Sequence, residues 1–127
     1  MSEREAFSAA ARIRSFRCAL RGLRHTLLSQ HNAWIHAVAT VAACGLGLLL
    51  GLSTLEWCAV ALAIAGVWAA EAFNSALESL CDAVSPEFHP QVERAKDMAA
   101  GAVLVAAVGA AVIGLLVFGP PLLRALG

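Results

Sequence analysis

LEWCAVALAIAGVWAAEAFNSALESLCDAV, residues 55–84, is an apolar run that turns polar in its second half. The polar side chains are spaced by three, four and four residues, at Glu71, Asn74, Glu78 and Asp82. At about 100° per residue, these positions lie on one face of a helix, within an arc of about 80°. The segment therefore predicts a membrane-crossing helix that carries a polar stripe at one end.

The overall composition places this helix in a membrane. Of the 127 residues, 60% are hydrophobic and 14% are charged, and the mean hydropathy is +0.75. This apolar fraction is well above that of soluble domains. The sequence predicts one all-α membrane domain over residues 1–127. The four cysteines have neither CxxC nor zinc-finger spacing, so a disulfide framework and a zinc site are not indicated.

Residues 1–30 form a predicted amphipathic surface helix. Its apolar positions recur every three or four residues, at Ile13, Phe16, Leu20, Leu23 and Leu27. A basic stripe lies beside them, at Arg14, Arg17, Arg21 and Arg24. This pattern is typical of a helix in the membrane interface, and a cytosolic helix packed on a partner is the alternative.

Three apolar stretches follow, and we predict membrane spans at residues 33–53, 55–84 and 98–119. Asn32 is a candidate N-cap for the first span, and the third is expected to stop at Gly119-Pro120-Pro121. Residues 85–97 form a polar loop whose second half could begin the next helix.

The distribution of positive charge orients the predicted bundle. Six of the nine Lys and Arg residues precede residue 25: Arg4, Arg12, Arg14, Arg17, Arg21 and Arg24. Arg94 and Lys96 lie in the second connection, and only Arg124 follows the third span. The N-terminus and the loop 85–97 are therefore predicted to be cytoplasmic. A basic N-terminus beside lipid favours contact with anionic headgroups over a nucleic-acid partner.

The polar stripe then lies on the side of the membrane where ATP is found. A charge at the centre of a membrane helix costs at least about 2.5 kcal/mol, so these residues are functional candidates. Carboxylate and amide oxygens suit Mg²⁺ that is shared with substrate phosphates. Glu71, the deepest, suits a general base for a hydroxyl group, and Lys96 near a helix N-terminus suits a phosphate. Together they suggest phosphoryl transfer to a membrane-embedded alcohol.

The spacing alone leaves two other hypotheses open. The stripe could form the path of a small proton-coupled transporter, or it could pack helices with its acids facing cytosolic water.

Four segments carry a specific resemblance over nearly the whole chain: RGLRH (21–25), NAWIH (32–36), EAFNSALESLCD (71–82) and RAKDMAAGAVL (94–104). They resemble the small prokaryotic diacylglycerol kinase and undecaprenol kinase family, whose signature is E-x-x-N-S-x-x-E-x-x-x-D. The resemblance implies an ATP-dependent lipid kinase that requires Mg²⁺. It also implies a homotrimer of chains with one surface helix and three membrane helices, and active sites shared between subunits.

The resemblance also implies roles for individual residues. Glu71 is similar to the general base, Glu78 to a ligand of the ATP-bound metal, and Asn74 to a polar organiser beside it. Further candidates for ATP binding are Glu87, His89, Lys96 and Asp97, and further substrate or organising residues are Ser75, Arg24 and Asn32.

Two positions depart from the family pattern. Gln30 stands where the family usually has a glutamate at the metal, and Cys18 where it often has a tyrosine near adenine. Gln30 is therefore a candidate metal ligand that lacks a charge, or alternatively a residue that caps or packs the first span. Cys18 is a candidate ATP contact. NAWIH resembles the undecaprenol-using branch and RGLR the diacylglycerol-using one, so both acceptors remain open.

Overall fold

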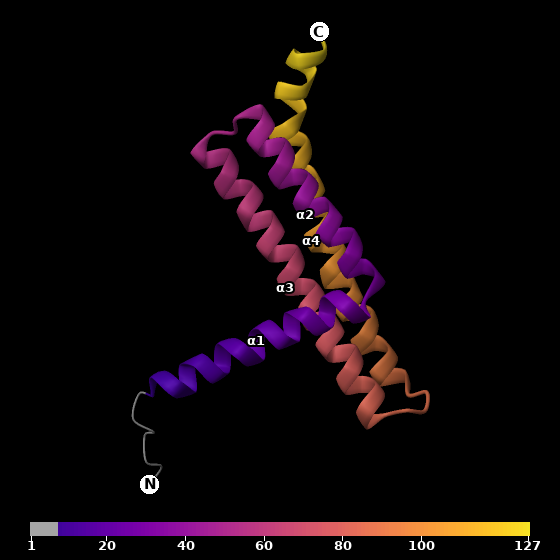
Figure 1. The fold of residues 1–127 in the computed structure, drawn as a ribbon. Helices are drawn as coiled ribbons and strands as arrows, with labels where there is room; N and C mark the ends of the chain where they lie inside the picture. Colours follow the sequence, from indigo (N-terminus) through magenta and orange to yellow (C-terminus); the bar gives the residue numbers. More distant parts are fainter. Residues whose placement is uncertain (1–7) are drawn as a thin grey trace.

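The computed structural model describes residues 8–127, and within this range the regular structure is entirely helical (Figure 1). The helices are α1 (Ala9–Ser29), α2 (His31–Leu50), α3 (Thr54–Val84) and α4 (Pro90–Leu126). The prediction of an all-α fold with one N-terminal helix and three apolar ones is confirmed. Arg4 and the rest of the first seven residues of the predicted surface helix lie outside the described residues.

Helices α2, α3 and α4 run side by side as a bundle, and α1 leaves this bundle at a steep angle (Figure 1). The most extensive packing joins α3 and α4. Because α3 and α4 have 31 and 37 residues against 20 in α2, the α3–α4 hairpin extends past the junction of α1 and α2 (Figure 1). This extension carries the polar stripe.

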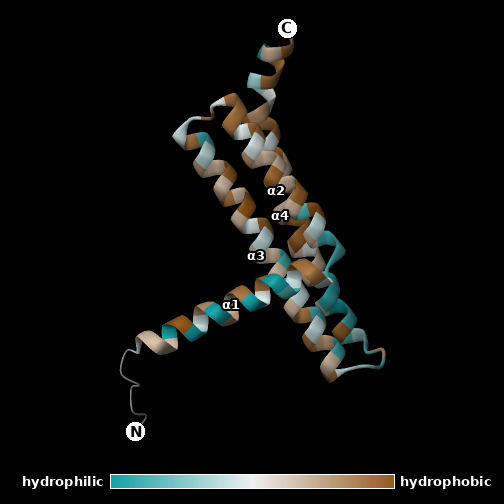
Figure 2. Cartoon of the chain, in the orientation of Figure 1, coloured by the Kyte–Doolittle hydropathy of each residue, from teal (hydrophilic) through white to brown (hydrophobic). Residues whose placement is uncertain are grey.

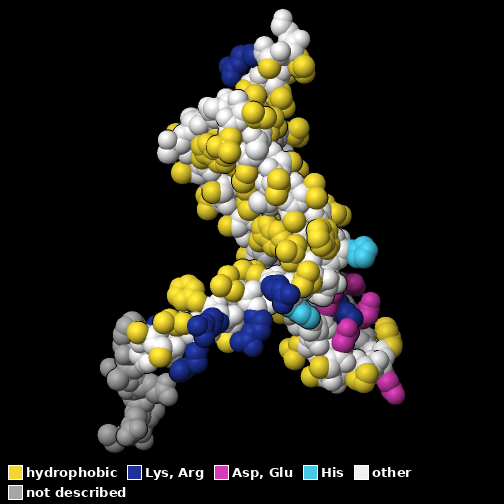
Figure 3. Space-filling view, viewed as in Figure 1, with side chains coloured by type: hydrophobic (Ala, Val, Ile, Leu, Met, Phe, Trp, Pro, Cys, Tyr) yellow, Lys and Arg dark blue, Asp and Glu magenta, His cyan; other side chains and the backbone are white. Residues whose placement is uncertain are grey.

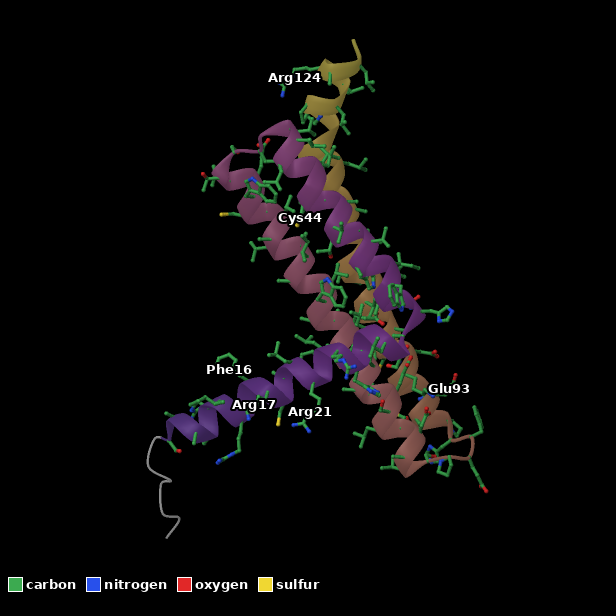
Figure 4. The ribbon with its side chains drawn as sticks, in the orientation of Figure 1. Phe16, Arg17, Arg21, Cys44, Glu93 and Arg124 are labelled. Atoms are coloured by element: carbon green, nitrogen blue, oxygen red, sulfur yellow. The ribbon has the colours of Figure 1, made fainter. Side chains whose placement is uncertain are left out.

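The outside of the bundle is apolar, as expected of helices that face lipid or neighbouring chains. Large hydrophobic side chains are exposed on all three bundle helices, including Val38, Leu49, Leu62 and Leu115, and Figure 2 shows that hydrophobic residues predominate along the bundle. Each of these helices is long and apolar enough to cross a membrane. On α1, Phe16 and Arg21 project from opposite sides (Figure 4), which fits the predicted amphipathic character.

The turn between α2 and α3 is closed by local backbone chemistry. Gly51 ends α2 in the left-handed region, with φ 65°, which a residue without Cβ adopts readily. Ser53 and Glu56 then form a capping box, in which Ser53 Oγ accepts from the Glu56 amide and Glu56 Oε2 accepts from the Ser53 amide. This turn holds α2 and α3 antiparallel.

The helix boundaries correct two predictions from the sequence. Asn32 is not the N-cap of α2, because the helix begins at His31 and Gln30 occupies the cap position. The Gln30 side chain makes no capping hydrogen bond and donates to Glu78 on α3 instead.

The second correction concerns α4, which continues past the predicted stop at Gly119-Pro120-Pro121. It begins at Pro90, inside the stretch 85–97, because proline suits the first helical position and His89 Nδ1 caps the helix by accepting from the Gln91 amide. The helix also continues through Pro120 and Pro121. A proline keeps a helical φ, and its missing N–H frees only a carbonyl one turn earlier, so the last turns remain helical.

Gly47 should be required for the packing of α2 on α3. A Cβ at this position would lie 2.8 Å from Cη2 of Trp57, whereas a Cβ at Gly45 would meet nothing within 4 Å. We expect Gly47→Val to lower the stability of the purified protein by about 1–3 kcal/mol through overpacking. Thermal unfolding in detergent, with Gly45→Val as the control, measures this difference. An equal melting temperature for the two variants would contradict the packing argument.

Candidate active site

The polar stripe of α3 passes from the interior of the bundle to its surface. Glu71 is completely buried, with 0% exposure, Asn74 is buried, Glu78 is half-buried and Asp82 is exposed. In the space-filling view, acidic side chains gather at the α3–α4 hairpin, and basic side chains line α1 (Figure 3). The predicted stripe is therefore graded in solvent access, with its deepest carboxylate shielded from water.

Two amides converge on the carboxylate of Glu78. Gln30 Nε2 donates to Oε2 over 3.2 Å from the α1–α2 junction, and Asn74 Nδ2 donates to Oε1 over 3.4 Å from one turn earlier on α3. Asn74 Oδ1 is buried and has no hydrogen-bond partner within the described residues. The structure thus brings together the three residues that the sequence proposed for metal binding and its organisation.

Glu71 lies beside a residue to which the sequence analysis gave no role, His36 on α2. His36 Nε2 is 3.5 Å from Glu71 Oε2, and the two side chains are 13% and 1% exposed. Neither this nitrogen nor either Glu71 oxygen has a hydrogen-bond partner in residues 8–127. A signal for His36 did exist, because an ionisable side chain within an apolar span is a functional candidate by default.

Lys96 on α4 faces the outer end of the stripe. Its Nζ lies 2.9 Å from Asp82 Oδ1. Lys96 precedes the long apolar stretch of α4, and the hydrogen bond that it donates to the Asp82 carboxylate raises the pKa of its ammonium group above the usual value. Both partners are solvent-accessible, and exposed ion pairs contribute little to stability. A phosphate or another anion could therefore replace Asp82 as the partner of Lys96 at a small cost in free energy.

The other predicted ATP contacts on this side lie on the surface around the α3–α4 connection. Glu87, His89 and Asp97 are all exposed. The Glu87 carbonyl accepts from Ser85 Oγ, and His89 caps α4. The capping bond uses Nδ1 of His89. Two of the residues predicted to contact the nucleotide, Glu87 and His89, therefore also order this connection.

Cys18 and Ser75 line a separate groove of about 720 Å³ between α1 and α3. Ser75 is buried, and its hydroxyl donates to the Glu71 carbonyl over 2.9 Å, while Cys18 Sγ accepts from Arg21. Arg24 and Asn32 are exposed. No hydrogen bond or ion pair of their side chains occurs within the described part of the chain, so a single chain does not join them to the stripe.

The donor set fits a hard cation that is shared with phosphates. Glu78 offers carboxylate oxygens, and Gln30 and Asn74 each carry an amide oxygen that a rotation of the amide group would direct toward the same point. No group of three His, Cys, Asp or Glu side chains in residues 8–127 is arranged to hold a metal by itself. These residues could therefore hold Mg²⁺ only together with nucleotide oxygens and water.

An apolar cavity of about 330 Å³ lies among α2, α3 and α4, and His36 is part of its wall. The remaining wall is built mainly of small and aliphatic side chains, including Ala39, Ala63, Val67, Ala110 and Gly114. The cavity places hydrocarbon-compatible volume directly next to the Glu71–His36 pair.

Comparison with known proteins gives consistent matches. The family described as "Prokaryotic diacylglycerol kinase" matches residues 17–118. The undecaprenol kinase of Bacillus subtilis is 41% identical over 109 residues, which cover 86% of this chain and 89% of that protein. The diacylglycerol kinase of Synechocystis sp. is 39% identical over 110 residues, which cover 86% of this chain and 63% of that longer protein. These matches do not favour the hypothesis of a proton-coupled transporter.

Proposed function

The chain belongs to the prokaryotic diacylglycerol kinase family and is a lipid kinase, and from that premise we propose that it transfers the γ-phosphoryl group of ATP to the hydroxyl group of diacylglycerol or undecaprenol. The products are phosphatidic acid or undecaprenyl phosphate. One observation supports this proposal most directly: Glu71 is fully buried, neither of its carboxylate oxygens accepts a hydrogen bond from the described part of the chain, and the Gln30–Asn74–Glu78 cluster lies next to it.

Glu71 acts as the general base. Its carboxylate takes the proton of the acceptor hydroxyl as that oxygen forms a bond to the γ-phosphorus, and the bond to the bridging oxygen breaks so that ADP leaves with the electron pair. Burial suits this role, because a carboxylate that is shielded from water and accepts no hydrogen bond within residues 8–127 is available to the lipid hydroxyl.

The remaining stripe residues bind and orient the nucleotide. Glu78, with Gln30 and Asn74, would hold Mg²⁺, and the bound metal would supply positive charge that neutralises developing phosphate charge. Lys96 exchanges Asp82 for a phosphate oxygen, and Asp97, Glu87 and His89 border the nucleotide from the start of α4 and the preceding loop. Cys18 lies in the groove between α1 and α3, and we propose that it meets adenine from a neighbouring subunit.

We propose that the protein lies in a bacterial inner membrane as a homotrimer with shared sites, as the family resemblance implies. The apolar surface supports the membrane setting. Exposed hydrophobic side chains cover the bundle, and either lipid or another chain must cover them. The arginines of α1 and the pair Arg94 and Lys96 support a cytoplasmic N-terminus and α3–α4 loop.

Transfer of radiolabel tests this function directly. Purified protein in lipid vesicles receives γ-labelled ATP and Mg²⁺, with diacylglycerol, undecaprenol or a short-chain analogue as the acceptor. Label should enter the organic phase with one of these alcohols. Absence of label with every lipid alcohol, together with solute uptake driven by a pH gradient, would support the transporter hypothesis instead.

Gln30 gives a prediction about the metal. Because Gln30 faces Glu78 over 3.2 Å, a carboxylate at this position would add one negative charge to the proposed Mg²⁺ site. We expect Gln30→Glu to reach half-maximal activity at about three- to tenfold lower free Mg²⁺ than the unchanged protein, since ligand charge sets affinity. A Mg²⁺ titration at saturating ATP measures the difference.

The matched control is Gln91→Glu, which adds the same charge at an exposed position on α4. It should leave the Mg²⁺ dependence unchanged. If Gln30→Glu has an unaltered or poorer metal dependence, position 30 packs or orients Glu78 and is not a metal ligand.

A further inference from the structure

His36 and Glu71 form an isolated pair in the apolar interior. His36 Nε2 and Glu71 Oε2 are 3.5 Å apart, slightly beyond the 2.7–3.2 Å of an N–H···O hydrogen bond. Both atoms are buried, and neither has another partner in residues 8–127. Buried polar atoms are rarely left unpaired in native structures, so a pair left open by a few tenths of an ångström needs an explanation. Hydrogen bonds at catalytic groups are often long without substrate and tighten when it binds.

A second set of contacts fixes the imidazole ring of His36. Trp68, one turn before Glu71 on α3, meets the ring edge-on, with centroids 6.4 Å apart and an interplanar angle of 68°. Its indole Nε1 donates to Thr40 Oγ1 over 3.0 Å, and the same hydroxyl donates to the His36 carbonyl over 2.7 Å. Trp68 and Thr40 thus hold the ring beside Glu71 and tie α2 to α3 at this level.

We propose that His36 is a positioning residue for phosphoryl transfer, which orients the carboxylate of Glu71 toward the acceptor hydroxyl. Within residues 8–127, the acceptor that lies near Nε2 is the carboxylate of Glu71, so a hydrogen on Nε2 is donated to Glu71 Oε2. That bond fixes the plane of the carboxylate and leaves Oε1 free to take the hydroxyl proton. His36 itself gains and loses no proton in the reaction.

The proposal rests on the proposed function, and its test separates the two. We expect His36→Ala to lower kcat for the lipid acceptor by about 10- to 100-fold, the usual cost of losing the partner that orients a functional group. The KM for ATP should stay within about twofold, because the Gln30–Glu78 contact and Lys96 are untouched. His36→Gln should regain most of the lost kcat, since its amide nitrogen can donate as Nε2 does. The control His31→Ala removes an exposed histidine from the same helix and should retain full activity.

A double-mutant cycle distinguishes positioning from general support of the fold. If His36 acts through the Glu71 carboxylate, His36→Ala should have little further effect in a Glu71→Gln background, because the carboxylate to be oriented is already gone. A structural role would instead lower the residual activity by the same factor in both backgrounds.

Three outcomes would overturn the inference: unchanged kcat in His36→Ala, no recovery in His36→Gln, or equal losses in both backgrounds of the cycle. In each of these, the unchanged protein still labels a lipid alcohol, so the proposed function survives. A protein that labels no lipid alcohol at all would remove the proposed function first and this inference with it.

Discussion

Glu71→Gln is expected to lower kcat by about 10²- to 10⁴-fold, the range that a general base contributes. Glutamine keeps the size and shape of the side chain at this fully buried position but cannot accept the hydroxyl proton. Because Glu71 makes no hydrogen bond to the Gln30–Asn74–Glu78 cluster, the affinities for Mg²⁺ and ATP should be nearly unchanged.

Steady-state kinetics with varied ATP and a saturating lipid acceptor measure this effect. Glu56→Gln is the matched control, because it makes the same change at the other end of α3, where a glutamine still completes the capping box with Ser53. A Glu71→Gln enzyme with normal kcat would show that another group takes the proton.

Glu78→Gln should have a comparably large effect through a different kinetic constant. Both oxygens of Glu78 accept hydrogen bonds from amides, and a glutamine would turn an NH₂ group toward one of these donors as well as remove the charge offered to Mg²⁺. Loss of a residue that only hydrogen-bonds to a metal ligand costs up to about 100-fold. Because Glu78 is a proposed direct ligand, we expect Glu78→Gln to lower kcat/KM for MgATP by at least this factor.

Much of this loss should appear as a raised KM for MgATP, which nucleotide titrations at several Mg²⁺ concentrations resolve. The division of roles on α3 depends on this contrast. Should Glu71→Gln and Glu78→Gln prove kinetically indistinguishable, the assignment of one to proton transfer and the other to metal binding would be wrong.

Local pattern was enough to predict most of the fold. Long apolar runs predicted the three bundle helices. Apolar residues at every third or fourth position, beside a stripe of arginines, predicted α1. The period of the stripe correctly placed Glu71, Asn74 and Glu78 on one side of α3, two of them in one hydrogen-bonded cluster. The predicted end of α4 at Pro120 and Pro121 was wrong, because a helix can continue through prolines near its end.

The spacing of residues within one helix does not predict which side chains of different helices meet. Gln30 and Glu78 are 48 residues apart, and they meet only because the α1–α2 junction lies beside α3 where the α3–α4 hairpin extends past it. The pairing of Lys96 with Asp82 likewise depends on how the α3–α4 hairpin packs. A role for His36 was not predicted, because that role depends on contact with Glu71, which lies on another helix.

Under the proposed function, the lengths of the bundle helices determine where the lipid reacts. The 31 residues of α3 measure about 46 Å, against about 30 Å for the hydrocarbon core of a bilayer, so the polar end of the helix reaches the headgroup layer. An acceptor lipid can therefore react without leaving its leaflet. The concentration that governs its reaction is the number of acceptor molecules per area of membrane. Turnover should follow the mole fraction of acceptor at the bilayer surface: diluting the vesicles with inert lipid would slow the enzyme even though the sample contains as much acceptor as before.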